Sequence, residues 1–499
     1  MPLFPRPLRN LLPLLLIGVV PSVLCAQQTP AQTIPENSGS SSSSSSSNSS
    51  QAGPQQAPAP KAPGAASLMD PAGPTVSLET SEAMFDMAVA LNACGYNSGL
   101  DESDPVRRRV RDEVNQATVG SARARDDRDK LCLFTDQHKL DDPGRSLAQY
   151  ISLALFLTPP PMMTPSVEQE DLPPDAAGVE QILPLLRKFA DDADLHAIFV
   201  ENHGAYEDMV NRLHTPLSQM IVNTNYYLKV PASTGSGRRF LVVLEPMLSP
   251  EETNARVYGQ DYVVVASPKD GQIRMQLVRH AYLHYEIEPL LYEREDSMDR
   301  LLPILKVVAD APLQFTFKSD IVALVIESMI RAIEARTLET GVDVPKIPPG
   351  LTHSAAEPYE RARSVAIEKI AAIKQRSVDH SMAQGFVLTQ YFYNQLIEFE
   401  KSPEGLDEAI GPMVYGMDMA TEVHRAKQLT FDAHGEDDPM SRAPMPLKGL
   451  DQAELKLMKG DVAGAGAMAQ HALDTHTGDA GQADFILARV DLMKGKIDD

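Results

Sequence analysis

The chain has 499 residues, with 45 Lys and Arg residues against 68 Asp and Glu residues, and its formal net charge is −23. This acidic balance argues against nucleic acid as a partner, because contacts with phosphate need a surplus of Lys and Arg. At roughly 150 residues per domain the length allows about three domains, and a hydrophobic content of 43% is enough to build their cores.

The N-terminus has the features of a secretory signal peptide at residues 1–26. Arg6 and Arg9 precede an apolar stretch at residues 11–20, and small residues that suit cleavage follow it. A membrane-spanning helix needs about 20 apolar residues, so this stretch is too short to be the preferred anchor. A lipoprotein attached through Cys25 is the alternative.

Residues 27–75 form a low-complexity segment rich in Ser, Gln, Ala and Pro. Such a composition buries too little apolar surface to offset chain entropy, so we expect a disordered tether. Together with the signal peptide it predicts an exported protein, periplasmic or secreted, with no transmembrane helix after signal cleavage.

Two cysteines, Cys94 and Cys132, remain after cleavage of the signal peptide. An oxidising compartment permits a disulfide between them, which would close a loop of about 39 residues and contribute on the order of 3 kcal/mol. Two buried free thiols are the alternative. Neither cysteine has the spacing of a metal or redox motif.

Residues 76–215 are predicted to form a helical domain. Apolar residues recur at helical spacing in the first part of this range, and Gly and Pro residues end the runs: 78–91, 107–119, 146–157 and 179–213. The composition gives no candidate for chemistry in this domain.

A change of pattern marks a central α+β domain at residues 216–345, in a chain that is otherwise mostly α. Short β-branched and aromatic runs bounded by turn signals predict a small antiparallel sheet with strands at Tyr226–Val230, Arg239–Pro246 and Tyr262–Ala266. Helices are expected at 273–289, at 294–309 and from an N-cap at Ser319 to about 339. An all-helical fold, with these runs buried as short helices, is the alternative.

The C-terminal part is predicted to be helical at 346–445 and to carry a repeat at 446–499. Leu457-Met458-Lys459-Gly460-Asp461 is echoed by Leu-Met-Lys-Gly-Lys 35 residues later. A period of about 34 residues with helix, turn and helix resembles the tetratricopeptide repeat, which implies protein-binding helical hairpins. A stable array wants roughly three repeats, so either earlier helices cap the stack or the chain is incomplete at its C-terminus. A plain helical hairpin is the alternative.

One constellation can carry chemistry. His280 and His284 lie four residues apart in a predicted helix, so their side chains are about 40° apart and share a face. Two imidazoles so placed can bind a single Zn²⁺. Glu327, in a later and strongly apolar helix, needs a partner for its charge, and a metal ion is a good one.

Strands, a helix with two histidines and a Glu on a later helix resemble the gluzincin branch of zinc metallopeptidases, over roughly residues 240–339. That family has the motif HExxH, and the resemblance implies that His280, His284 and Glu327 are zinc ligands. The Glu inside the motif is the general base that activates the attacking water, and its position here is Ala281. Loss of a general base commonly costs about 10²–10⁴-fold in rate.

Other interpretations of these residues stay open. Glu288 lies near the His280 and His284 face and is the one plausible local replacement for the base, or a third ligand in place of Glu327. A histidine pair on a helix is often a core pair that is hydrogen-bonded to a carboxylate. Glu327 can equally form an ion pair with Arg279 or Arg331.

The sequence therefore favours an exported, non-catalytic interaction protein with a degenerate peptidase-like domain, zinc as the candidate metal and a protein or peptide as its partner. The alternative is an active zinc metallopeptidase that uses the three ligands and a relocated base, Glu288. Position 281 distinguishes the two hypotheses and favours the first.

Overall fold

The computed structural model describes residues 76–230, 238–259, 261–435, 440–442, 449–458, 462–475 and 480–494. The signal peptide and the tether predicted for residues 1–75 lie outside this part of the chain. The described residues are mostly helical with one small sheet, which confirms the predicted fold class. None of their helices has the length and apolar composition that crossing a membrane would need.

The sheet has five strands in the order β1-β2-β4-β3-β5. Their bounds are β1 Val76–Glu79, β2 Arg239–Leu244, β3 Thr253–Tyr258, β4 Asp261–Ala266 and β5 Met440–Arg442. The antiparallel sheet expected from the sequence is corrected to a mixed one. Only β3 and β4 run antiparallel, whereas β1 with β2, β2 with β4, and β3 with β5 are parallel.

The mixed topology has a physical reason in the central strands. Every residue of β2 and of β4 is buried, as is usual for strands that are covered on both faces in parallel sheets. Strand β3 comes between β2 and β4 in the sequence and runs antiparallel to β4. Strand β4 therefore runs parallel to β2. β1, β3 and β5 were missed because each is short or carries polar residues.

The strand expected at Tyr226–Val230 is wrong. Residues 226–228 are the last turn of the long helix α7 (Leu195–Leu228), which ends where Lys229 takes a left-handed conformation with φ of 56°. Tyr226 and Tyr227 continue a helix of 34 residues, and this context outweighs the β propensity of two adjacent tyrosines.

Six helices precede α7 in the region where a helical domain was expected. Their bounds are α1 Glu82–Ala93, α2 Pro105–Gly120, α3 Ala122–Gln137, α4 Pro143–Leu155, α5 Pro174–Val179 and α6 Leu183–Asp192, with short 3-10 helices at Gln169–Asp171 and Glu180–Ile182. A disulfide joins Cys94, the C-cap of α1, to Cys132 in α3. Strand β1, at the start of the expected helical domain, pairs with β2 of the central sheet. Helix α7 runs through residues 215 and 216, where the boundary between the two domains was expected.

In the described part of the chain, eight helices lie between the central strands and the predicted repeat region. Their bounds are α8 Met275–Tyr292, η3 Glu295–Ile304, α9 Phe315–Ser319, α10 Ile321–Thr337, α11 His353–Ala383, α12 Thr389–Phe399, α13 Leu406–Tyr415 and α14 Met419–Ala426. The helix expected at 294–309 is a 3-10 helix. The N-cap of α10 is Asp320 and not Ser319, because the Asp320 carboxylate accepts hydrogen bonds from the N–H groups of Val322 and Ala323.

The repeat region contains three helices, α15 Gly449–Met458, α16 Val462–Asp474 and α17 Ala480–Met493. They share a small apolar core of their own, in which Ala465 and Ala469 are fully buried. The predicted turn residues Lys459, Gly460 and Asp461 lie outside the described part. The tetratricopeptide assignment stays a prediction.

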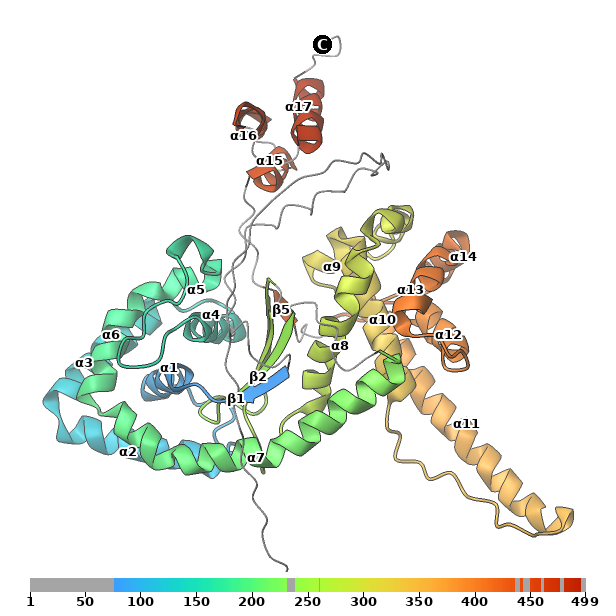
Figure 1. The fold of residues 1–499 in the computed structure, drawn as a ribbon, viewed down its shortest axis with the longest axis horizontal. Coiled ribbons are helices and arrows are strands. Elements are labelled where there is room, and N and C mark those ends of the chain that lie inside the picture. The colour runs from blue at the N-terminus through green and yellow to red at the C-terminus, as the bar shows by residue number, and fades with distance from the viewer. Residues whose placement is uncertain are drawn as a thin grey trace, which may run out of the picture. The chain divides into compact units, whose positions relative to one another are not determined.

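Helix α8 lies between the sheet and helix α10 (Figure 1), and its side chains belong to two apolar cores. On one side Ala281, Tyr282 and Tyr285 pack with the sheet and the N-terminal helices. On the other side Leu283 and Ile287 pack with η3, α10 and α12. Polar side chains on α8 therefore lie between two apolar regions, where they need partners from the protein itself or from a bound ion.

Candidate metal centre

Helix α8 is buried almost all round, and every residue from 280 to 288 is buried. Little of either histidine is exposed to solvent: His280 is 4% exposed and His284 is 2% exposed. The two rings share one face, as the helical period predicted, and their Nε2 atoms lie 3.2 Å apart.

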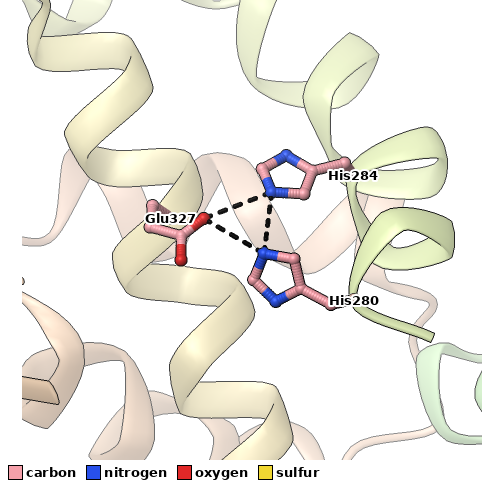
Figure 2. Close-up of side chains that lie close together, drawn as sticks. All are labelled: His280, His284 and Glu327. Carbon is pink, nitrogen blue, oxygen red and sulfur yellow. Dashed lines mark hydrogen bonds and ion pairs between the residues drawn. The ribbon is translucent and has the colours of Figure 1, made fainter. Parts of the chain in front are cut away.

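Helix α10 supplies the third group. Residues 321–330 are all buried, and Glu327 lies in the middle of them with 1% exposure. Its Oε2 atom is 3.2 Å from Nε2 of His284 and 3.5 Å from Nε2 of His280. The structure thus brings together the three residues that the sequence proposed as ligands, and their atoms converge on one point (Figure 2).

The three atoms fit a divalent metal ion. Two ligands at about 2.0–2.2 Å from a tetrahedral centre are roughly 3.3–3.5 Å apart, close to the three separations found here. Oε2 of Glu327 is buried and has no hydrogen-bond partner. An orphaned carboxylate oxygen beside two imidazole nitrogens is the donor set expected of a metal site.

Carboxylates hold both histidine rings from the opposite side. His284 donates from Nδ1 to Oε1 of Glu288 at 2.6 Å, and His280 donates from Nδ1 to Oε1 of Glu334 at 3.0 Å. Tyr262 in β4 donates to Oε2 of Glu288 at 2.6 Å. A neutral ring that keeps its proton on Nδ1 presents the Nε2 lone pair to a metal ion, and such carboxylate–histidine pairs commonly orient metal ligands.

The open alternatives for Glu327 are partly resolved. Arg331, one turn further along α10, donates from Nε to Oε1 of Glu327 at 2.7 Å. The ion pair therefore occupies one carboxylate oxygen and leaves Oε2 directed at the histidines. Arg279 forms no ion pair with Glu327 among the described contacts; its Nε donates to Oγ1 of Thr224 at 3.2 Å.

The electrostatics of the protein groups alone are those of a buried charged cluster. Burial by itself would lower the pKa of His280, but the carboxylates of Glu334 and Glu327 outweigh it and raise that pKa to about 10. Burial would also lower the pKa of His284, but its contacts with Glu288 and Glu327 outweigh this effect and raise that pKa. For Glu327 burial would raise the pKa, yet His280 and Arg331 hold it well below its usual range. A divalent cation can replace the positive charge of the two imidazolium groups.

Position 281 lacks a proton acceptor. Ala281 is 1% exposed and packs in the core that contains the sheet. Glu288, the candidate replacement, contacts the Nδ1 side of His284, opposite the Nε2 atoms that converge with Glu327. This placement suits an orienting carboxylate better than a base or a third ligand.

Two residues of the site, Glu334 and Tyr262, were not predicted from the sequence. Glu334 lies two turns after Glu327 on the same face of α10, and this seven-residue spacing is a signal that could have found it. Tyr262 lies in a strand whose position relative to Glu288 depends on tertiary packing, so no local signal identifies it.

A large cleft opens beside the metal centre. It has a volume of about 2020 Å³ and is lined by parts of α7, α8, α9, α10 and β3. We name it the His280 cleft, because His280 is the one candidate ligand among its lining residues, which also include Asn223, Asn254, Arg279 and Glu334.

No protein-family model, no curated protein and no solved structure matches this chain. The gluzincin and tetratricopeptide resemblances therefore stay predictions. The candidate metal centre depends on its own geometry, namely two Nε2 atoms and one carboxylate oxygen that converge in a buried site.

Proposed function

We propose that this chain is an exported, non-catalytic protein that binds Zn²⁺ through His280, His284 and Glu327 and holds a peptide in the His280 cleft. Two imidazole nitrogens and one carboxylate oxygen are a common zinc donor set. Imidazole also binds copper, iron and nickel. We assign zinc because the donor set of two imidazole nitrogens and one carboxylate oxygen is common in zinc sites.

One observation carries the non-catalytic assignment: among the described residues, the carboxylates that contact the two histidines besides Glu327 lie on the Nδ1 sides of the rings and not at the converging ligand atoms. Ala281 stands where the resembled family has its base. These carboxylates, Glu288 and Glu334, each accept a hydrogen bond from an Nδ1 atom on the far side of a ring. A general base must reach the proton that it abstracts.

The metal ion, when bound, would supply a divalent charge and a Lewis acid between helices α8 and α10. The chain's own residues determine its role. His280 and His284 belong to α8, Glu327 belongs to α10, and shared coordination would therefore tie these two helices together. We propose a structural role for the metal, with the adjoining cleft as the binding surface.

Several features favour a peptide as the partner in the cleft. Its volume exceeds that of ordinary small-molecule pockets, which is about 300–1,000 Å³. Two aromatic rings at the cleft are exposed to solvent, Tyr226 at 86% and Phe315 at 81%. Exposed aromatic side chains of this size are typical of protein-binding surfaces.

Elemental analysis of the purified chain tests the metal assignment. Wild type, His284→Ala and Glu327→Gln are compared after purification without chelators, with His196→Ala as the matched control because its ring is 71% exposed. We expect one zinc per chain in wild type and in His196→Ala and none in the two ligand variants. Absence of metal from wild type after incubation with zinc would overturn the proposal.

A peptidase assay tests the non-catalytic assignment separately. We expect no zinc-dependent hydrolysis of a degenerate peptide mixture by the zinc-loaded chain. Hydrolysis that is lost both with a chelator and in Glu288→Gln would overturn this assignment and establish the metallopeptidase alternative.

A further inference from the structure

Arg279 is the residue before His280 on α8, and both line the His280 cleft. The cleft also contains Arg331 and Arg336 from α10. These arginines lie in a chain whose net charge is −23. They differ in whether a carboxylate of the protein forms an ion pair with the guanidinium group.

The two α10 arginines are paired within the protein. Arg331 donates to Glu327 at 2.7 Å, and Arg336 donates from Nε to Glu400 at 2.8 Å. Arg279 has no carboxylate within ion-pair distance among the described residues. Its one hydrogen bond runs from Nε to Oγ1 of Thr224, and Nη1 and Nη2 have no partner in this part of the chain.

Arg279 is also half-buried, so its charge is not fully solvated. Oε1 of Glu334 accepts the hydrogen bond from Nδ1 of His280, and among the described residues Glu334 forms no ion pair with Arg279. A half-buried guanidinium without a counter-charge is costly unless a ligand supplies one.

We infer that Arg279 binds a carboxylate of the peptide that occupies the His280 cleft, an inference that rests on the proposed peptide-binding function. The hydrogen bond to Thr224 holds the guanidinium through Nε and leaves its two terminal nitrogens for the ligand. A carboxylate matches this fork and accepts two parallel hydrogen bonds from it.

The carboxylate can come from two sources, the C-terminus of the peptide or the side chain of Asp or Glu. The exposed rings of Tyr226 and Phe315 lie at the same cleft and offer contacts for apolar side chains. The preferred ligand is therefore a peptide that combines one carboxylate with apolar residues.

Peptide retention by the full exported chain, loaded with zinc, tests this inference. Four pools of degenerate hexapeptides are used: with a free or an amidated C-terminus, and with or without Asp and Glu. Bound peptides are quantified by mass spectrometry. We expect wild type to retain at least one pool with carboxylates about tenfold more than the amidated pool without Asp and Glu. The pool that is preferred identifies the source of the carboxylate.

Three variants assign the preference to Arg279. Arg279→Gln should lose the preference while it retains the neutral pool and the zinc content of wild type, and Arg279→Lys should keep part of the preference. Arg212→Gln removes the same charge from an exposed position of α7 outside the cleft lining and should behave as wild type.

The outcomes separate this inference from the proposed function. Equal retention of charged and neutral pools by wild type would overturn the inference and leave peptide binding standing; this comparison needs no variant to fold. An undiminished preference in Arg279→Gln would also overturn it. Retention of no pool by wild type would overturn both the inference and the peptide-binding function.

Discussion

Glu288 and His284 lie one turn apart on α8, and the Glu288 carboxylate accepts a hydrogen bond from Nδ1 of His284 at 2.6 Å. Both side chains are at most 3% exposed. The pair fixes the tautomer and the direction of the ring, so Nε2 points to Glu327 and to the ring of His280. At the proposed metal site Glu288 is therefore expected to position His284 and not to act as a substitute base.

Weakening these positioning contacts is expected to weaken metal binding. Glu288→Gln and Glu334→Gln should each lower zinc affinity by about 10–100-fold, because a neutral amide orients and polarises imidazole less well than a carboxylate. Competition with a chromogenic chelator measures the affinity. Glu293→Gln, at an exposed position just after α8, is the matched control. Unchanged affinity in both variants would contradict an orienting role.

Removal of the buried Arg107 side chain should strongly destabilise the fold. Arg107 is 0% exposed, and its guanidinium donates to the carbonyl oxygens of Tyr96, Ser98 and Leu248, among others. Arg107→Ala removes these charge-assisted hydrogen bonds and leaves the carbonyl oxygen of Ser98 without its arginine donor, so we expect a loss of about 3–5 kcal/mol in the free energy of unfolding. Urea denaturation measures it.

The adjacent arginine provides the control for that measurement. The side chain of Arg108 is 56% exposed and pairs with a fully exposed Asp101. Arg108→Ala should change the free energy of unfolding by no more than about 0.5 kcal/mol. Similar losses in both variants would show that Arg107 has no special role.

The pH dependence of stability should contain a contribution from Asp86. Burial, with Glu82 and Glu245 nearby, raises the pKa of Asp86 to about 8. The folded protein then holds a proton that the unfolded chain releases near pH 4, so this contribution to stability is full below pH 4 and is lost as the pH rises to 8. The loss is at most about 1.4 kcal/mol per pH unit.

Asp86→Asn removes this titration. We expect the variant to gain stability relative to wild type as the pH rises from 4.5 to 7.5, measured by urea denaturation at several pH values. Asp101→Asn, at an exposed site, should show no such trend. A difference between Asp86→Asn and wild type that stays constant with pH would refute the raised pKa.

Loss of the Cys94–Cys132 disulfide should destabilise the N-terminal helices. The bond joins residues separated by 38 positions, and cross-linking such a loop restricts the unfolded chain by about 2–4 kcal/mol. The double variant Cys94→Ser with Cys132→Ser should lose this amount in denaturant unfolding. Wild type treated with a reductant should show the same loss, and stability that is insensitive to reduction would contradict it.

Local periodicity accounts for the parts of the site that the sequence could identify. The four-residue spacing of His280 and His284 is enough to place both rings on one face, because a helix repeats every 3.6 residues. The same arithmetic relates Glu288 to His284, and Glu327 to Glu334. Within one helix, sequence spacing therefore determines which side chains meet.

Tertiary structure decided what lies between elements. The sequence contains no spacing rule that brings Oε2 of Glu327 to the histidines of α8, or Tyr262 of β4 to Glu288. It also did not determine that β2 and β4 run parallel or that residues 226–228 complete a helix. These relationships depend on which apolar faces are buried together, and such burial is decided among residues far apart in the chain. The sequence by itself determined the faces of α8 and α10, and only packing between two apolar cores made those faces into one site.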